Sequence, residues 1–135
     1  REKIWDRAPE TAYRYAADVL KSRFELGEPA IATDEFSSYR YACDVLKGPF
    51  ELGEPVIAKD SWHSYLYAKF VIKGRFKLGE PEIAKHADHS YNYAHSVLHG
   101  RFELGEPAIA KDGTNFYFYS VEFLNNKNAR NPFAG

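Results

Sequence analysis

Residues 39–60 read YRYACDVLKGPFELGEPVIAKD, and the same pattern returns at residues 65–86 as YLYAKFVIKGRFKLGEPEIAKH. The step between equivalent positions is 26 residues, and it also relates residues 13–34 to residues 91–112 with few changes. Self-similarity at a short fixed period is typical of solenoid proteins, in which each unit buries its apolar face against its neighbours. The sequence therefore predicts a tandem repeat array rather than a fold with distant chain pairings.

The repeats account for nearly the whole chain, which we interpret as one repeat domain over residues 1–135. Its predicted parts are a half-repeat at 1–12, four repeats at 13–38, 39–64, 65–90 and 91–116, and a C-terminal half-repeat with a tail at 117–135. The chain has no methionine and begins part-way through a unit, with Trp5 at the position of Ile31. These features favour a trimmed chain or a fragment of a longer array.

Each unit is expected to form a pair of helices, and the first helix of the pair has recognisable ends. Aspartate side chains accept the unpaired amide hydrogens at a helix start, which suits Asp34, Asp60 and Asp112. Glycine adopts the left-handed conformation that ends many helices, which suits Gly48, Gly74 and Gly100. The predicted helix between these signals has about three turns, which is marginal in isolation, so each unit must depend on its neighbours.

A shorter second helix of about two turns is predicted to begin at Glu-Pro dipeptides such as Glu54-Pro55, because proline fits the first helical turn. We expect the glutamate there to satisfy backbone donors and to favour the helix dipole. The linker aromatics Phe24 and Phe50 are expected to close the groove between the two helices. The predicted fold class is therefore all-α, a short α-solenoid of tandem 26-residue helix-pair repeats.

The pattern Y-x-Y-A-x-x-V-[LI]-K-G-R-F-x-x-G-E-x-x-I-A-x-D resembles short tandem helical repeats of uncharacterised phage and bacterial proteins. More loosely, it is similar to Sel1-like and tetratricopeptide arrays, although the 26-residue unit is shorter and their signature residues do not align. The resemblance implies a repeat architecture and a phage or bacterial accessory factor, and it carries over no catalytic residue. Together with the single cysteine, it favours the cytoplasm of a bacterium or of a phage-infected host.

One face of the first helix changes from repeat to repeat, at the positions equivalent to Arg14, Ala17, Asp18 and Lys21. Such a face is either unconstrained or diversified to fit a partner protein, and we adopt the second interpretation as our functional hypothesis. In the third repeat the face carries two large apolar residues one turn apart, which suit a binding anchor. The candidate partner-binding residues are Arg14, Arg40, Leu66, Lys69, Phe70, Lys73, Asn92, His95, His99 and Phe118.

The last predicted helix favours a second function, self-assembly as a structural repeat protein. It begins with the aromatic run FYFY at residues 116–119 and continues with Val121, Phe123 and Leu124. A terminal repeat needs a polar outer face to stay soluble, and this helix does not have one. Either the tail at residues 132–135 folds back over it, or another subunit covers it, which predicts self-association through the C-terminal helix.

Single-stranded nucleic-acid binding is a third alternative, because tyrosines recur along the repeats and tyrosine rings stack on bases. The two tyrosine ladders are Tyr13, Tyr39, Tyr65, Tyr91 and Tyr117, and Tyr15, Tyr41, Tyr67, Tyr93 and Tyr119. A formal net charge of -1 argues against it, since nucleic-acid binders usually carry a basic excess. The basic row Arg23, Arg75 and Arg101 also has glutamates beside it.

We find no sign of an enzyme, a cofactor or a metal site in the sequence. His95 and His99 have the four-residue spacing of zinc ligands on a helix, but both occupy variable surface positions. Cys43 is the only cysteine, and no H-E-x-x-H, phosphate-loop or nucleophile-elbow motif is present. No run of about 18 apolar residues occurs, so the sequence predicts no membrane-spanning helix.

Overall fold

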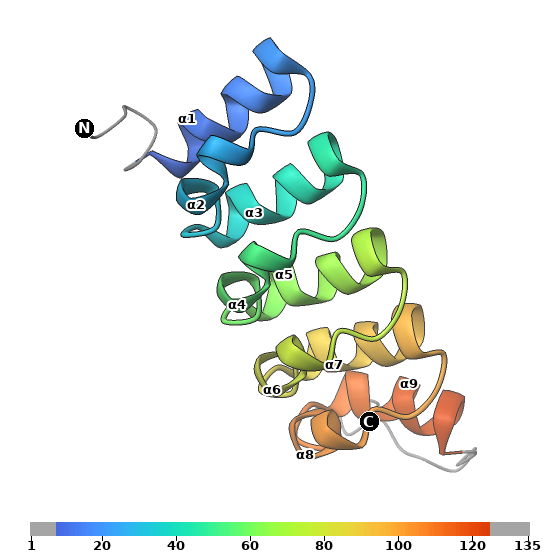
Figure 1. Cartoon of the computed structure of the whole chain (residues 1–135). Coiled ribbons are helices and arrows are strands. Elements are labelled where there is room, and N and C mark those ends of the chain that lie inside the picture. Colours follow the sequence, from blue (N-terminus) through green and yellow to red (C-terminus); the bar gives the residue numbers. More distant parts are fainter. Residues whose placement is uncertain (1–7, 125–135) are drawn as a thin grey trace.

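The computed structural model describes residues 8–124, and every regular element in this range is helical. The helices form successive pairs that stack along one direction, as Figure 1 shows from the blue N-terminal pair to the red C-terminal helix. The predicted all-α solenoid of short helix pairs is thereby confirmed. The interpretation of Trp5 and the expected fold-back of residues 132–135 concern parts of the chain outside the described range.

The first helix of each repeat changes type along its length, from α-helical to the wider π-helical winding. Its two parts are α1 (Pro9–Arg14) with η2 (Tyr15–Leu20), α3 (Glu35–Tyr41) with η4 (Ala42–Leu46), α5 (Ser61–Leu66) with η6 (Tyr67–Ile72), and α7 (Ala87–Tyr93) with η8 (Ala94–Leu98). The last helix, α9 (Gly113–Phe123), is α-helical throughout. Since a π turn has a wider hydrogen-bonding step, side-chain spacing in the second half differs from that of a regular α-helix.

The second helix of each repeat is a 3-10 turn that runs directly into one turn of α-helix. These segments are η3 (Glu25–Gly27) with α2 (Glu28–Ile31), η5 (Glu51–Gly53) with α4 (Glu54–Ile57), η7 (Lys77–Gly79) with α6 (Glu80–Ile83), and η9 (Glu103–Gly105) with α8 (Glu106–Ile109). The sequence pattern had placed the 3-10 residues in a linker. The helical segment therefore begins three residues earlier than the Glu-Pro signal predicts.

The predicted aspartate caps are present at three helix starts. Carboxylates of Asp34, Asp60 and Asp112 accept hydrogen bonds from backbone amides three residues later, at 2.8, 2.8 and 3.0 Å. The start of α7 differs, because His86 occupies the cap position and its side chain makes no capping hydrogen bond. The start of α1 carries Pro9 in its first turn, as expected.

The prediction that glycine supplies the left-handed residue at the helix end is wrong. The left-handed residues lie one position earlier, at Lys21, Lys47, Lys73 and His99, with φ of 53°, 53°, 58° and 53°. The glycine that follows instead donates its amide to the helix, as Gly48 does to the Ala42 carbonyl at 3.1 Å. A carbonyl in a π turn accepts from an amide farther along the chain than a carbonyl in an α-helix does. The left-handed residue that ends the helix therefore lies one position before the one that an α-helical pattern indicates.

The core is built from the same few positions in every repeat. Alanines such as Ala42 are fully buried and allow neighbouring helices to approach closely, and the linker phenylalanines close the space between the two helices, as predicted. The Tyr41 ring packs on Phe50 with ring centroids 4.9 Å apart. The largest buried side chains recur with the repeat: Tyr41, Tyr67, Tyr93 and Tyr119, Phe24, Phe50, Phe76 and Phe102, and Ile31, Ile57, Ile83 and Ile109.

A buried tyrosine hydroxyl joins each repeat to the one before it. Tyr41 accepts a hydrogen bond from the Phe24 amide at 2.8 Å and donates one to the Glu28 carboxylate at 2.6 Å. Tyr67, Tyr93 and Tyr119 repeat both contacts. The glutamates at the start of the second helix therefore hold the tyrosine of the next repeat, a role that the sequence did not indicate. They also lie in the first turn of the helix, as expected for an interaction with its dipole.

The arginines expected to form a basic row are paired with these glutamates. Arg23 contacts Glu28 at 2.8 Å and Arg75 contacts Glu80 at 2.7 Å, and Arg101 pairs with Glu106 in the same way. In the second repeat the arginine position holds Pro49.

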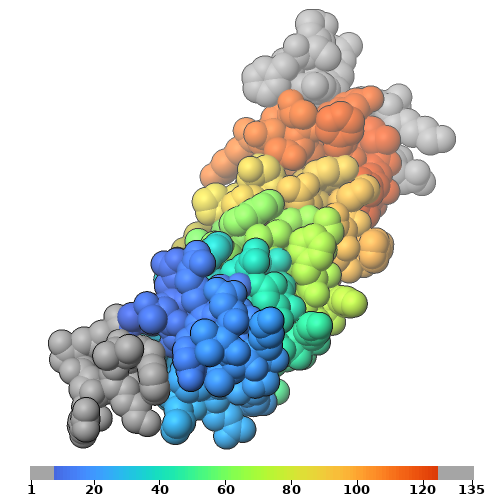
Figure 2. Space-filling view, turned by 90° about the horizontal axis from the view of Figure 1, so that it is seen from above, coloured from blue at the N-terminus to red at the C-terminus, as the bar shows by residue number. Residues whose placement is uncertain are grey.

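The space-filling view in Figure 2 shows the resulting stack as an elongated body in which the repeats follow one another in sequence order. Within residues 8–124, no helix has the length and apolar character that a membrane crossing requires.

Candidate interaction surface

The main concavity among the variable residues lies between the second and third repeats. It is a groove of about 680 Å³ beside the adjacent segments η4 and η6. Three of the candidate residues from the sequence, Arg40, Phe70 and Lys73, line it together with Lys47 and Cys43. Phe70 is 53% exposed and is the one phenylalanine among the residues that line the groove.

This junction lacks a hydrogen bond that is present at two other junctions. The Tyr13 hydroxyl donates to Asp44 in the next repeat, and the Tyr91 hydroxyl donates to Glu122 at 2.7 Å. The equivalent position opposite Tyr39 is Phe70, which cannot accept this bond. Burial together with a contact to Cys43 raises the pKa of Tyr39. Substitution of the acid by phenylalanine thus leaves an apolar ring facing the groove.

One lysine lies against Phe70, and two others line the same groove. The Lys69 ammonium lies 5.1 Å from the centre of the Phe70 ring, and Lys47 and Lys73 line the groove at their left-handed positions. Arg40 forms an ion pair with Asp44 at 2.9 Å, so this pair adds little net charge. The groove therefore combines one exposed aromatic surface with a positively charged rim.

Leu66 does not share this exposure with Phe70. It is half-buried and packs against the hydrophobic core, while Phe70 points into the groove region. The winding changes from α to π at Tyr67, directly between the two residues, so the spacing that brings them to one face of an α-helix no longer applies. The structure thus brings Phe70 together with lysines rather than with Leu66.

The other candidates are spread along the stack. Arg14 forms an ion pair with Glu10 at 3.1 Å, and His95 contacts Glu122 of the following half-repeat at 2.6 Å. Asn92 is half-buried, and His99 is exposed at a left-handed position. Phe118 is 50% exposed on α9, beside exposed Val121 and Leu124. Asn125, the last position of the variable face, lies outside the described residues.

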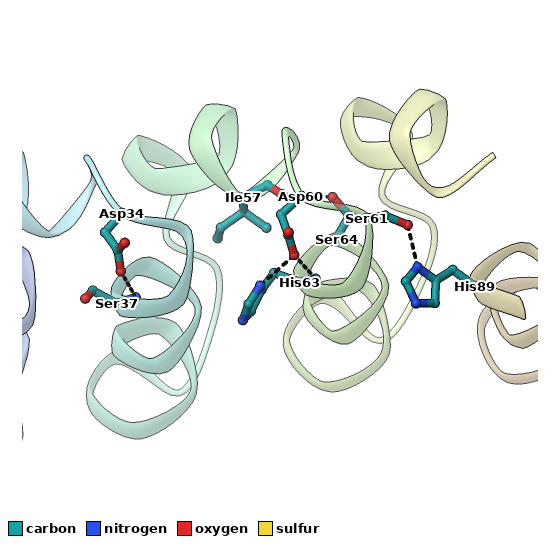
Figure 3. A network of polar contacts seen from close by, with 8 residues as sticks. All are labelled: Asp34, Ser37, Ile57, Asp60, Ser61, His63, Ser64 and His89. Carbon is teal, nitrogen blue, oxygen red and sulfur yellow. Dashed lines mark hydrogen bonds and ion pairs between the residues drawn. The ribbon is translucent and has the colours of Figure 1, made fainter. Parts of the chain in front are cut away.

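A row of polar contacts marks the starts of the first helices, and the sequence pattern did not identify it. Figure 3 shows Asp34 with Ser37, Asp60 with His63, and Ser61 with His89 of the next repeat. Burial alone would raise the pKa of Asp60, but the hydrogen bonds from the amide and ring of His63 outweigh this effect and lower it. The row caps helices and links adjacent repeats, so we interpret it as structural, although the buried Ser37 hydroxyl has no partner among the described residues.

The described residues offer no alternative centre of chemistry. No group of three or more His, Cys, Asp or Glu side chains within residues 8–124 is arranged to hold a metal ion. Burial raises the pKa of the Cys43 thiol, which disfavours the reactive thiolate. In the second tyrosine ladder Tyr41, Tyr67, Tyr93 and Tyr119 are buried, so these rings are not available to stack on bases. In the first ladder Tyr65 is buried, and the others are half-buried: Tyr13, Tyr39, Tyr91 and Tyr117.

One exposed feature repeats without change and was missed in the sequence. Leucines in the 3-10 turns are all more than half exposed, namely Leu26, Leu52, Leu78 and Leu104. The sequence shows the same residue at this position in every repeat, but it predicts a linker there, and exposure does not follow from repetition alone. Comparisons with protein-family models, with curated proteins and with solved structures found no match.

Proposed function

We propose that the chain is a protein-interaction module that binds an acidic, extended segment of a partner protein in the groove between the second and third repeats. The observation that carries this proposal is an exposed Phe70 with Lys69 beside its ring, in a groove of about 680 Å³ that Lys47 and Lys73 also line. An apolar side chain of the partner would lie against Phe70, and flanking carboxylates would contact Lys47 and Lys73. Exposed apolar side chains within a polar surround are typical of binding anchors.

The backbone at the two lysines supports a role for their side chains. A residue other than glycine in the left-handed conformation costs about 1 kcal/mol or more, and such strain often occurs at functional positions. Here the lysine takes this conformation although a glycine stands next to it, as in Lys73-Gly74. A cation near a helix end also interacts favourably with the helix dipole, so the two roles must be separated by experiment.

The resemblance to short repeats of phage and bacterial proteins suggests the setting. In this setting the module is an accessory factor that binds a host or partner protein in the cytoplasm of a bacterium or an infected host. Binding by surface complementarity needs no cofactor and no catalytic group. We therefore propose a binding protein rather than an enzyme.

A random peptide library selected on the immobilised chain tests the proposal. We expect enrichment of peptides with a large apolar residue flanked by Asp or Glu, and loss of their binding in Phe70→Asp. Lys73→Gly should retain or increase stability, because it relieves the left-handed strain, yet weaken binding by about tenfold through loss of one charged contact. The matched control is Phe36→Asp, since Phe36 is also about half exposed (51%) but lies on α3, away from the groove.

Two results would contradict the groove proposal. One is enrichment of peptides without acidic residues, and the other is equal binding of the enriched peptides to the wild type and to Phe70→Asp. Peptides that lose binding in Phe36→Asp but not in Phe70→Asp would place the binding surface at the other end of the first helices.

Self-assembly through α9 is a second candidate, favoured by the exposure of Phe118, Val121 and Leu124. If a second copy covers this helix, Phe118→Glu should convert concentration-dependent oligomers to smaller species, as measured by light scattering after size exclusion. Oligomers that persist unchanged in Phe118→Glu would remove α9 as the contact.

A further inference from the structure

We propose that a second copy of the chain docks in antiparallel orientation on the four exposed leucines Leu26, Leu52, Leu78 and Leu104, here named the leucine ridge. Their exposed fractions are 66%, 56%, 57% and 56%. A repeat position that keeps one apolar residue in all four repeats without burying it has no role in the core of the isolated chain. An interface that uses every repeat accounts for both the identity and the exposure.

The ridge runs along one edge of the stack. Each leucine lies in the 3-10 turn that leads into a second helix, and Figure 1 shows α2, α4, α6 and α8 following one another along that edge. An exposed proline follows three residues after each leucine, at Pro29, Pro55, Pro81 and Pro107. The apolar stripe therefore recurs in all four repeats, and none of its leucines lines the Phe70 groove, although Pro49 borders both that groove and the hollow beside Leu52.

The charges beside the ridge select the occupant and its direction. The residue before each leucine is Glu25, Glu51, Lys77 or Glu103, so the third repeat carries the one cation. In an antiparallel pair the second repeat faces the third, and Glu51 meets Lys77 of the second copy twice, once on each side of the two-fold axis. A parallel pair would instead place Glu51 against Glu51 and Lys77 against Lys77, which is repulsive.

The arginine pattern agrees with this pairing. Arg23 lies 3.8 Å from Glu25, and Arg101 stands two residues before Glu103, so each outer glutamate has a guanidinium beside it. Glu51 differs because Pro49 takes the arginine position in its repeat. Within the part of the chain that the structure describes, neither Glu51 nor Lys77 forms an ion pair. The acid without an arginine is therefore the one that faces the single lysine.

A hollow beside Leu52 gives the second copy a place to enter. It measures about 300 Å³ and is lined by residues of the first two repeats, including Pro49, Glu51, Leu52 and Glu28. Phe50 and Leu52 give it an apolar side for Leu78, and Glu51 offers a carboxylate to Lys77 of the second copy. Glu28 is already paired with Arg23, which also lines the hollow. The smaller Pro49 side chain at the arginine position leaves this hollow open in the second repeat.

Sedimentation velocity of the full chain, from low micromolar to submillimolar concentration, tests the interface. We expect a reversible monomer–dimer equilibrium that Leu52→Asp with Leu78→Asp weakens at least about tenfold, because charged residues replace the two central anchors. These side chains are exposed in the single chain, so far-UV circular dichroism should be unchanged. Val19→Asp with Phe36→Asp is the matched control, which removes two exposed apolar residues (64% and 51%) off the ridge and outside α9 and should leave dimerisation intact.

Charge reversal tests the pairing. Glu51→Lys and Lys77→Glu should each weaken the homodimer, and a mixture of the two variants should form a heterodimer, since opposite charges then face each other across both central contacts. Failure of the mixture to associate more tightly than either variant alone would overturn the pairing of Glu51 with Lys77.

Disulfide trapping tests the direction in a Cys43→Ser background. Leu52→Cys and Leu78→Cys should form a mixed disulfide when combined, and neither should link to itself. Self-linked chains of either variant would overturn the antiparallel arrangement. A wild-type chain that stays monomeric at submillimolar concentration, or a ridge that binds basic peptides as a monomer, would overturn the second-copy proposal. The Phe70 groove is not part of this surface, so these results leave the peptide-binding proposal to its own test.

Discussion

At the scale of single residues, two glycines in one repeat have opposite requirements. A Cβ at Gly79 would lie 2.4 Å from Ser64 Oγ and 2.8 Å from the Phe76 ring, whereas a Cβ at Gly74 would have its nearest neighbour at 3.9 Å. Both residues have negative φ, so only the packing differs. A side chain at Gly79, in the 3-10 turn, would therefore clash with its neighbours. A side chain at Gly74, after the first helix, would not.

We predict that Gly79→Ala lowers the free energy of unfolding by about 2–3 kcal/mol, as overpacking does in a dense core. Gly74→Ala, the matched control, should change it by less than about 1 kcal/mol. Urea denaturation followed by circular dichroism measures both values. Similar losses in the two variants would show that the close contact at Gly79 relaxes without cost.

The helix starts offer a second residue-scale comparison. Asp60 accepts the amide hydrogen of His63 at 2.8 Å, while His86 at the equivalent position makes no capping bond. We predict that His86→Asp stabilises the fold and that Asp60→Ala destabilises it, each by about 1 kcal/mol. The Asp60 pKa is lowered in the fold, so its contribution is complete at neutral pH and is lost as acid protonates the folded carboxylate. Equal stability of His86→Asp and the wild type would contradict the capping argument.

At the scale of the helix pair, the buried tyrosine hydroxyls predict an alkaline limit to stability. Burial first, and then the bond to Glu106, raises the pKa of Tyr119 to about 12, and burial raises those of Tyr41, Tyr67 and Tyr93 further. The unfolded chain ionises near the ordinary value of about 10, before the folded chain does. Stability should therefore be constant below about pH 10 and fall between about pH 10 and pH 12.

The expected slope in that range is about 1.4 kcal/mol per pH unit for each such tyrosine. Urea denaturation at several pH values, with tyrosine ionisation followed by absorbance, measures it. Tyr119→Phe should reduce the slope, although it also leaves the Phe102 amide without its acceptor and so lowers stability at neutral pH. A stability that stays level up to pH 12 would contradict the role of the hydroxyls.

The helix pair is also the scale at which sequence and structure separate most clearly. The period, the caps at Asp34 and Asp60, and the burial of Ala42 follow from local rules, and the sequence was sufficient to predict them. The shift of the left-handed residue from Gly48 to Lys47 and the separation of Leu66 from Phe70 depend on the π winding. The sequence pattern was interpreted with the period of a regular α-helix, which does not contain that winding.

The candidate site was predictable only in part for the same reason. Arg40, Phe70 and Lys73 were identified as variable surface residues, but their convergence on one groove depends on the missing acid opposite Tyr39. The role of Glu28 as the partner of Tyr41 links positions 13 residues apart in adjacent repeats, and no pattern within one repeat indicates it.

At the scale of the whole molecule, the array should be most stable in its middle. Repeats contact only their neighbours, so a terminal repeat has one interface and a central repeat has two. The burial pattern agrees: Tyr15 in the first repeat is 37% exposed and Val19 is 64% exposed, whereas Tyr41, Tyr67 and Tyr93 are fully buried. The free energy of local opening should therefore rise from the first repeat toward the second and third.

Native-state hydrogen exchange measures this gradient directly. We predict that amides in η4 and η6 exchange at least about tenfold more slowly than those in η2, because opening η2 disrupts one inter-repeat contact surface instead of two. Gly79→Ala, which strains the third repeat, should speed exchange more in η6 and η8 than in η2, since its effect passes to adjacent repeats first. Equal protection from η2 to η8, changed uniformly by Gly79→Ala, would mean that the array unfolds as one cooperative unit. In that case the free energy that couples adjacent repeats, to which the tyrosine contacts at each junction contribute, is larger than the intrinsic stability of a single repeat.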